Sequence, residues 1–256
     1  INECDERKGT NYINNFYLEA SKCADHVIFV SNWLEKIYID IGMPIDKTSV
    51  IMSGADEDVF NSEGLSEFNH KKIKIVTHHW SAHMNKGFEI YEKLDSLISS
   101  AKYQHFEFTY IGNVPSGVSF NNTEIKEALS GKALANEIKK NHIYLTASIN
   151  EPSGNHHIEA AQCGLPILYL DSGGIPEYCN GYGVSFTNNF EESLNKIVDN
   201  YYTHKAKLED YPFSAQTMCE EFLNQFIEVK NKKLYKEPEI NKIIMYIFLF
   251  KNNVQK

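Results

Sequence analysis

The chain has 256 residues, of which 42% are hydrophobic and 23% are charged, a composition typical of soluble globular proteins. Its formal net charge of −9 excludes a general nucleic-acid-binding protein, because neutralising phosphates requires a basic face. Five scattered cysteines without a Cys-x-x-Cys pair favour a reducing compartment, and no apolar run approaches the length of a membrane span.

Short β-branched runs alternate with helix-length stretches along the chain. Strands are predicted at residues 26–30, 49–52, 73–77, 106–112, 142–146 and 166–170. Helices are predicted at residues 11–23, 31–41, 86–100, 123–140, 155–163, 189–204 and 214–232. This alternation predicts an α/β protein in which helices cover both faces of a parallel sheet.

Capping residues support three of these helices. Ser31 and Thr123 stand directly before helical patterns and are predicted as N-caps. Ser153 is predicted to cap the helix that begins near Asn155, and Gly164 is predicted to close it.

The chain is predicted to contain one complete domain and part of another. Two early strands are too few for an independent domain, so the first segment is expected to be the end of a domain that begins upstream. The predicted parts are a domain remnant at 1–56, a polar linker at 57–71, a Rossmann-like domain at 72–213, a helix at 214–232 and a tail at 233–256. The tail carries eight consecutive apolar residues, "IIMYIFLF", which favour an element completing a larger body over a membrane contact.

The loop "THHWSAHMNKGFEIY" follows the strand "IKIVT" and is the first candidate binding segment. Ligands of open α/β sheets bind at the carboxyl ends of the strands, and Lys86 before a helix start suits an anion. The alternative is a solvated surface lysine. His78, His79 and His83 suggest a metal, but no carboxylate or cysteine stands at a supporting spacing, so no metal site is predicted.

Two glycine-containing segments follow later strands. In "YIGNVPSG", Gly112 would let a ligand approach the backbone, although strand-to-loop turns use glycine anyway. In "DSGGIPEYC", Gly173 and Gly174 give a tight turn that exposes backbone amides, and Pro176 fits an early helical position.

The segment "NEPSGNHHIEAAQCGLP" is the most informative. The amides of Gly154, Asn155 and His156 at its helix start form a ready site for a phosphate. Glu159, about one turn further in, is placed to accept both hydroxyls of a ribose, and Glu151 lies where a substrate joined to the phosphate would extend. The alternative is a loop carboxylate and a first-turn helix residue that complements the helix dipole.

These segments resemble a known family. Glu151 and Glu159, followed by "AAQCGLPIL" and "SGGIPE", are similar to the donor-site motif of retaining glycosyltransferases of family 4, the glycosyl transferases group 1. The segments "ADHVIFVSNWLEKIY" and "SVIMSGADEDVF" resemble the last strand–helix–strand of the family's N-terminal domain and its linker. The resemblance covers roughly residues 1–232 and implies the GT-B architecture of two facing Rossmann-like domains.

The resemblance also implies a role for each site residue. Glu151 would be the catalytic residue that holds hydroxyls of the transferred sugar, and Glu159 would hold the ribose. The implied donor-binding residues are Lys86, Gly112, Gly154, Asn155, His156 and Glu159. The family uses no metal and retains the anomeric configuration, so side-chain cations and helix N-termini must stabilise the departing nucleotide and neither glutamate is a covalent nucleophile.

The chain departs from the family pattern in two respects. The family commonly places an arginine a few residues before the lysine, whereas residues 71–90 contain none. His79 or His83 could partly substitute for it, although each is a weaker cation at neutral pH. Most of the acceptor-binding domain is also absent. We therefore expect donor binding but little transfer by this chain as given.

Two alternatives to a glycosyltransferase stay open: a noncatalytic nucleotide-sugar-binding module and a sugar-nucleotide epimerase. A conventional NAD-binding protein is disfavoured, because no Gly-x-Gly-x-x-Gly follows a strand. The expected partners are a nucleotide-diphosphate-sugar donor, which is a substrate and not a cofactor, and a glycan or lipid-linked acceptor. The expected location is the cytoplasm, either free or at the cytoplasmic face of a membrane.

Overall fold

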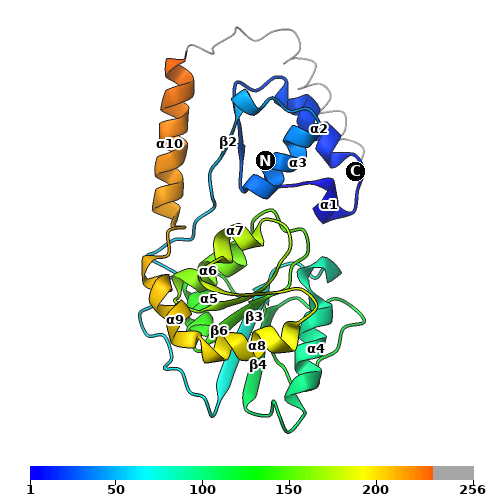
Figure 1. Ribbon diagram of the computed structural model, residues 1–256, viewed down its shortest axis with the longest axis vertical. Helices are drawn as coiled ribbons and strands as arrows, with labels where there is room; N and C mark the ends of the chain where they lie inside the picture. Colours follow the sequence, from blue (N-terminus) through cyan, green and yellow to red (C-terminus); the bar gives the residue numbers. More distant parts are fainter. Residues whose placement is uncertain (233–256) are drawn as a thin grey trace. The chain divides into compact units, whose positions relative to one another are not determined.

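The computed structural model describes residues 1–232, which fall into two compact units (Figure 1). The larger unit is Ser53–Met218, and the smaller combines Ile1–Met52 with the described residues 219–232. The predicted C-terminal helix is α10 (Ala215–Asn231), which spans this division. The predicted tail and its apolar run lie outside the described residues. Within residues 1–232, no helix has the length and apolar character needed to cross a membrane.

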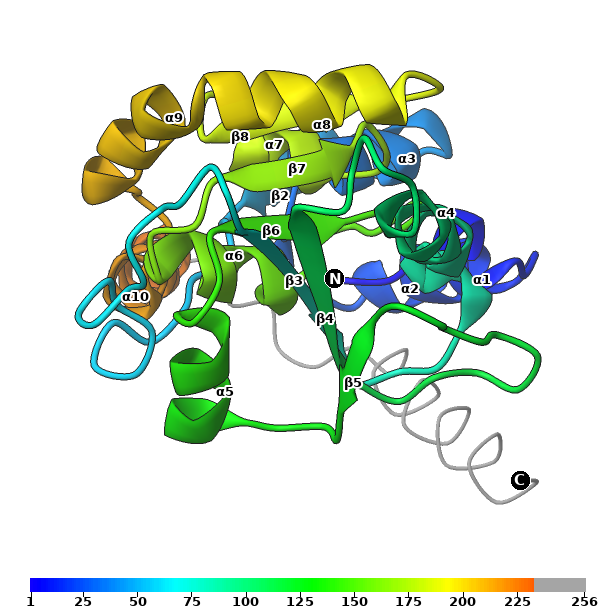
Figure 2. The same ribbon diagram turned by 90° about the horizontal axis from the view of Figure 1, so that it is seen from below.

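The larger unit is built on one parallel sheet of six strands. They are β3 (Ile73–His79), β4 (Phe106–Gly112), β5 (Glu124–Lys126), β6 (Ile143–Thr146), β7 (Ile167–Leu170) and β8 (Gly183–Phe186). Their order in space is β5-β4-β3-β6-β7-β8, so the chain runs outward from β3 to one edge and then outward from β6 to the other (Figure 2). The predicted α/β fold with a parallel sheet is confirmed.

Helices cover both faces of this sheet. The helices α4 (Phe88–Ile98), α8 (Phe190–Asp199) and α9 (Tyr201–Lys207) contribute to one hydrophobic core with the strands. Two further helices, α5 (Gly131–Ile138) and α6 (Asn155–Gln162), lie on the side opposite α4 (Figure 2). The short helix α7 (Ile175–Cys179) packs against β7 and β8, and 3-10 turns occupy η2 (Met84–Lys86) and η3 (Leu208–Asp210).

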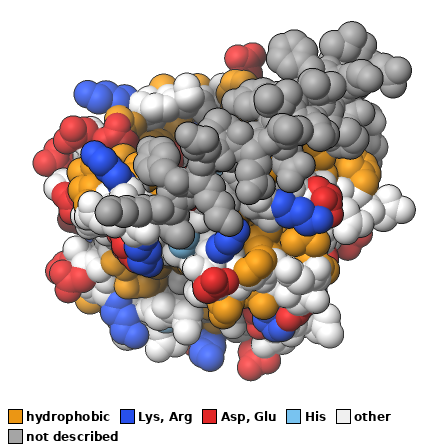
Figure 3. Space-filling model, turned by 90° about the horizontal axis from the view of Figure 1, so that it is seen from above, with side chains coloured by type: hydrophobic (Ala, Val, Ile, Leu, Met, Phe, Trp, Pro, Cys, Tyr) orange, Lys and Arg blue, Asp and Glu red, His pale blue; other side chains and the backbone are white. Residues whose placement is uncertain are grey.

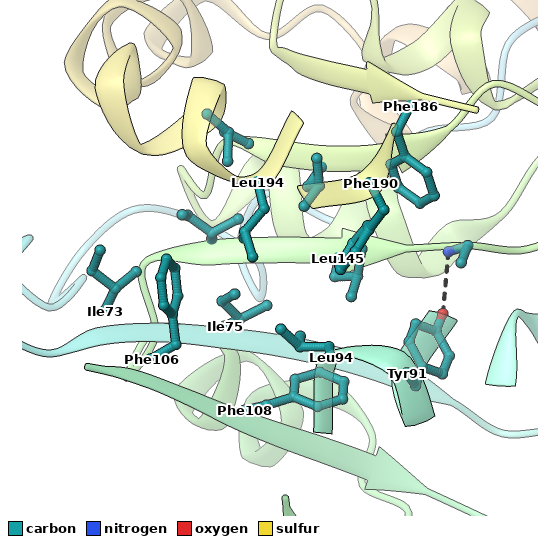
Figure 4. Close-up of a cluster of buried hydrophobic side chains, with 14 of the residues drawn as sticks. Ile73, Ile75, Tyr91, Leu94, Phe106, Phe108, Leu145, Phe186, Phe190 and Leu194 are labelled. Atoms are coloured by element: carbon teal, nitrogen blue, oxygen red, sulfur yellow. Dashed lines mark hydrogen bonds between the residues drawn. The ribbon is translucent and has the colours of Figure 1, made fainter. Parts of the chain in front are cut away.

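Alternation along the central strands decides which side chains enter the core. Ile73 and Ile75 of β3, together with Leu145 of β6, pack against residues of α4 and α8 that include Leu94 and Phe190 (Figure 4). Successive side chains of a strand point to opposite faces. The residues between them in sequence, such as those at 74, 76 and 144, therefore point toward the other face of the sheet.

The smaller unit contains a two-stranded parallel sheet and short helices. Its elements are α1 (Asp5–Lys8), α2 (Ile13–Ser21), β1 (Val27–Phe29), α3 (Asn32–Asp40), η1 (Ile45–Lys47) and β2 (Thr48–Val50). The predicted N-cap of α3 is confirmed, because the Ser31 hydroxyl accepts a hydrogen bond from the Leu34 amide at 3.3 Å. Phe29, Leu34 and Tyr38 are wholly buried and form its core.

The predicted helix at 123–140 is wrong in its first part. Residues 124–126 form the edge strand β5, and the helix α5 begins only at Gly131. Thr123 is not an N-cap: its hydroxyl donates to the buried carboxylate of Asp95 at 2.6 Å. The amides of Asn121 and Asn122 donate to the same carboxylate. This tertiary contact fixes an extended approach to β5 and overrides the helical propensity of "EIKEAL".

Two further differences concern the end of the larger unit. The predicted helix at 189–204 is divided at Asn200, whose φ of −107° and ψ of 17° separate α8 from α9. The edge strand β8 was not predicted, because "GVSF" is short and begins with glycine.

On the face shown in Figure 3, the visible basic and acidic side chains are interspersed among hydrophobic ones.

Candidate functional site

The candidate site lies where the order of strands reverses, between β3 and β6. After β3 the chain continues to β4 on one side, and after β6 it continues to β7 on the other, and ligands of open α/β sheets bind at such a point. The two loops are tied together, because the Ile149 amide donates to the Asn85 carbonyl at 2.8 Å. A side chain at Gly87, whose φ is +94°, would place its Cβ 2.4 Å from the Ala147 carbonyl oxygen. Glycine is therefore needed for the approach that brings Lys86 to this crevice.

Lys86 and Glu151, two of the predicted donor-site residues, form a buried ion pair. The Lys86 ammonium lies 2.5 Å from Glu151 Oε2, and the two side chains are only 11% and 4% exposed. The alternative of a solvated surface lysine is thus wrong. The pair places a positive and a negative group side by side at the carboxyl edge of the sheet.

The backbone of Glu151 is held by the loop that follows β7. The Gly174 amide donates to the Glu151 carbonyl at 2.8 Å, and the Asn150 amide donates to the Ser172 hydroxyl at 2.9 Å. A Cβ at Gly173 would lie 2.5 Å from the Glu151 carbonyl oxygen. The glycine pair therefore supports the Glu151 loop. The prediction that the Gly174 amide is exposed is wrong, because this amide is bonded to the Glu151 carbonyl.

The helix α6 begins at Asn155, as predicted, with its amino end at the same crevice. Its N-cap is Gly154 and not Ser153, and no side chain caps it. The rings of His156 and His157 pack so close to Gly154 that a Cβ there would lie 2.3 Å from His156 Cε1. The first amides of the helix are thus left without a capping side chain, which suits an anionic ligand.

Glu159 lies one turn into α6 and contacts a residue that the sequence did not pair with it. His78 Nε2 lies 2.9 Å from Glu159 Oε2, and the Glu159 side chain is 20% exposed. The sequence prediction placed His78 in a loop, whereas β3 extends to His79. Counting the strand alternation two residues further would have placed His78 on the same face as Val76, facing α6.

His79 does not replace the arginine that the family commonly has. Its ring is buried, and its Nε2 lies 2.7 Å from the Tyr91 hydroxyl of α4. Burial, and next the positive charge of Lys86, hold the pKa of His79 well below 6.5. The imidazole is neutral at pH 7 and cannot balance a diphosphate charge.

The side chains of His156 and His157 are also buried and neutral. Thr146 Oγ1 lies 2.9 Å from His156 Nε2, and burial keeps the pKa of His156 well below 6.5. His156 can therefore offer an anionic ligand a hydrogen bond from its backbone amide, but no positive charge from its ring. Burial lowers the pKa of His157 to about 3, and its ring nitrogens have no hydrogen-bond partner among residues 1–232.

Gly112 has a structural role beside its predicted ligand role. Its φ is +134°, and a Cβ there would lie 1.9 Å from the carbonyl oxygen of His79, its partner on β3. We expect Gly112→Ala to lower the free energy of unfolding by about 2–4 kcal/mol, the combined cost of backbone strain and overpacking. Urea unfolding measures this. A variant of unchanged stability that had lost only ligand binding would contradict the structural role.

The described residues contain no group of three or more His, Cys, Asp or Glu side chains arranged to hold a metal ion. The groups that do converge are one buried ion pair, one partly exposed glutamate and an uncapped helix start. Such a set can bind an anion beside hydroxyl groups.

Comparison with known proteins finds a family model that matches part of the chain. Residues 120–213 match the model described as glycosyl transferases group 1. The chain is 25% identical over 150 residues to the phosphatidylinositol N-acetylglucosaminyltransferase gpi3 subunit of Schizosaccharomyces pombe, covering 52% of this chain and 32% of that protein. It is 27% identical over 231 residues to a probable sucrose-phosphate synthase of Thermosipho melanesiensis, covering 76% and 50%. The predicted resemblance to the glycosyl transferases group 1 is confirmed, and the chain spans half or less of the length of these relatives.

The fold is shared with solved glycosyltransferase structures. The structure of Anabaena Alr3699/HepE in complex with UDP and glucose matches with a TM-score of 0.71 at 15% identity. The match covers 88% of this chain and 70% of that chain. The predicted GT-B-type Rossmann-like sheet is confirmed.

Proposed function

We propose that this chain is the nucleotide-sugar-binding part of a glycosyltransferase, which moves a sugar from a nucleotide-diphosphate donor to an acceptor. The observation that carries the proposal is the convergence of Lys86, Glu151, Glu159 and the start of α6 at the strand reversal. These four features match the chemistry of one ligand, which has a sugar, a diphosphate and a ribose.

The Lys86–Glu151 pair supports the assignment of adjacent roles. In a nucleotide sugar the transferred sugar is bonded directly to the diphosphate, so the residues that hold the two must be neighbours. Lys86 would bind the diphosphate together with the amides of Gly154, Asn155 and His156, and Glu151 would hold hydroxyls of the sugar. Without a donor, the ammonium and the carboxylate neutralise each other at 2.5 Å.

Glu159 would accept hydrogen bonds from the ribose hydroxyls. It lies one turn along α6 from the proposed phosphate-binding amides, and its carboxylate is partly exposed. The neighbour HepE was solved with UDP, which makes UDP a suitable first ligand to test.

The proposed reaction retains the anomeric configuration and needs no metal, as in family 4. Lys86 and the helix start would then stabilise the departing diphosphate, which is the largest electrostatic demand of the step. Glu151 would orient the sugar without forming a covalent bond to it. The acceptor is proposed to be a glycan or a lipid-linked saccharide.

A noncatalytic nucleotide-sugar-binding module is the second candidate. It is favoured by the inward pairing of His79 with Tyr91, which removes one of the two histidines that could replace the arginine. The two candidates differ in a single measurement, the release of UDP from UDP-glucose when acceptor saccharides are added.

Glu159→Gln should weaken the binding of UDP by about 1–3 kcal/mol, because a neutral amide replaces the charged acceptor of two ribose hydroxyls. Isothermal titration calorimetry in the presence of EDTA measures the change and tests metal independence together. A thermal shift with a panel of nucleotide sugars would identify the donor, since a ligand that binds the folded state raises its stability.

Glu192→Gln is the matched control for this substitution. Glu192 is an exposed carboxylate on α8, so its replacement changes the net charge equally and should leave UDP affinity unchanged. Equal affinity of Glu159→Gln and the unmodified protein for UDP would exclude the ribose role. Binding that vanished with EDTA would exclude metal independence.

A further inference from the structure

The carboxylate of Glu159 is the outer end of a chain of hydrogen bonds that begins in the sheet. His78 Nε2 lies 2.9 Å from Glu159 Oε2, and the other ring nitrogen, Nδ1, lies 3.1 Å from the hydroxyl of Tyr144. The backbone amide of His78 donates to the same Tyr144 oxygen at 3.1 Å. Three elements, β6, β3 and α6, each contribute one member of this chain.

The chemistry of the carboxylate sets the direction of the hydrogen bonds along this chain. A carboxylate accepts only, so His78 Nε2 carries a hydrogen and donates it to Glu159. When the ring is neutral, Nδ1 is then its acceptor and takes the hydrogen of the Tyr144 hydroxyl at 3.1 Å. The same hydroxyl lies 3.4 Å from the His78 carbonyl oxygen, which is a longer contact for that hydrogen. Burial raises the pKa of Tyr144 well above 10, so the phenol keeps that hydrogen at neutral pH.

Exposure increases along the chain toward the crevice. Tyr144 is wholly buried, the His78 residue is 8% exposed, and the Glu159 side chain is 20% exposed. Each carboxylate oxygen accepts two hydrogen bonds, so the contact from His78 leaves acceptor positions for two hydroxyl groups. The buried end is closed to solvent, and the open end is the carboxylate that would meet the ligand.

Resting on the proposed function, we propose that His78, oriented by Tyr144, is a positioning residue that holds the Glu159 carboxylate ready to accept the ribose hydroxyls. A glutamate side chain on a helix has several rotatable bonds, and ordering it costs free energy when a ligand binds. A fixed hydrogen bond from a buried ring removes most of that cost before binding.

The test compares UDP with 2′,3′-dideoxy-UDP, which lacks both ribose hydroxyls, by titration calorimetry. The unmodified protein should bind UDP about tenfold or more tightly than the dideoxy compound, as expected for hydrogen bonds to a charged group. Relative to the unmodified protein, His78→Leu should bind UDP roughly tenfold more weakly and dideoxy-UDP less than about twofold more weakly. His78→Gln, which keeps a donor, should recover part of the loss.

Tyr144→Phe and Tyr91→Phe form a matched pair. Each removes a phenol hydroxyl bonded to a histidine of β3, but Tyr91 serves His79, which faces α4 and not Glu159. Tyr144→Phe should reduce the preference for UDP, whereas Tyr91→Phe should leave it unchanged. Long-range ¹H–¹⁵N spectra should show the Nε2–H form of His78 in the unmodified protein.

Two results would overturn the inference. One is an Nδ1–H form of His78, and the other is full retention of the preference for UDP in His78→Leu, whether or not both affinities fall. If the unmodified protein and Glu159→Gln both bound the two nucleotides equally, the ribose role of Glu159 would fail and the positioning role with it. Failure of the positioning role alone would instead leave the effect of Glu159→Gln intact.

Discussion

Replacing Lys86 by methionine should lower the free energy of unfolding by about 3–5 kcal/mol, because it leaves the buried Glu151 carboxylate without its cation. Methionine keeps the approximate length of the side chain, so the loss comes from the charge and not from a cavity. The Glu151 side chain is 4% exposed, so little water reaches the carboxylate to replace the ammonium. Equilibrium urea unfolding measures the change.

A double variant distinguishes the effect of removing the whole ion pair from the effect of removing one of its charges. Lys86→Met with Glu151→Met removes both charges, and replacing a buried ion pair by apolar groups is often nearly neutral. We therefore expect the double variant to be more stable than Lys86→Met alone, while neither binds UDP-glucose detectably in calorimetry. A double variant that was less stable than both single variants would show that the pair is not the source of the loss.

Lys93→Met is the matched control for the lysine substitution. Lys93 also lies near a glutamate, with its Nζ 3.7 Å from Glu191 Oε1, but the two side chains are 42% and 44% exposed. Exposed ion pairs contribute about 0–1 kcal/mol, so this variant should unfold almost as the unmodified protein does. A comparable loss in both lysine variants would indicate a general effect of reducing the positive charge.

The strands that were predicted well are those whose type is set by local sequence. The run "FEFTYIG" is rich in β-branched and aromatic residues, and its predicted bounds are those of β4. The predicted end of β3 at residue 77 was two residues short, since the polar pair His78–His79 resembles a loop. Those two residues matter for the site, because the strand alternation places His78 against Glu159 and His79 against Tyr91 on opposite faces of the sheet.

The contacts between predicted site residues could not be derived from spacing. Lys86 and Glu151 were assigned to one ligand on the positions of their loops, but their direct pairing depends on the adjacency of β3 and β6. Similarly, the support of the Glu151 loop by Gly173 depends on which strand follows β6 in space. Local patterns name candidate residues, and the order of strands decides which of them touch.

Buried histidines should make the protein sensitive to acid. The pKa values of His79, His156 and His157 are lowered in the folded state, whereas unfolded histidines take up a proton below about pH 6.5. Below that pH the unfolded state binds more protons, so stability is lost as the pH falls. Each histidine costs up to about 1.4 kcal/mol per pH unit, and the three together cost up to about 4 kcal/mol per pH unit. For His157 this window extends from about 6.5 down to its folded pKa of about 3.

His157→Phe isolates one of these contributions. The ring packs at 5.4 Å from that of Tyr178, and phenylalanine fills similar space without two buried nitrogens that lack partners among residues 1–232. The variant should be at least as stable as the unmodified protein at pH 7.5, and its advantage should grow by about 2 kcal/mol between pH 7.5 and 5. Urea unfolding at both pH values measures this. Ile158→Val, on the same helix, removes no titrating group and should cost the same about 1 kcal/mol at both. An advantage of His157→Phe that did not grow on acidification would mean that His157 takes up its proton in the folded protein.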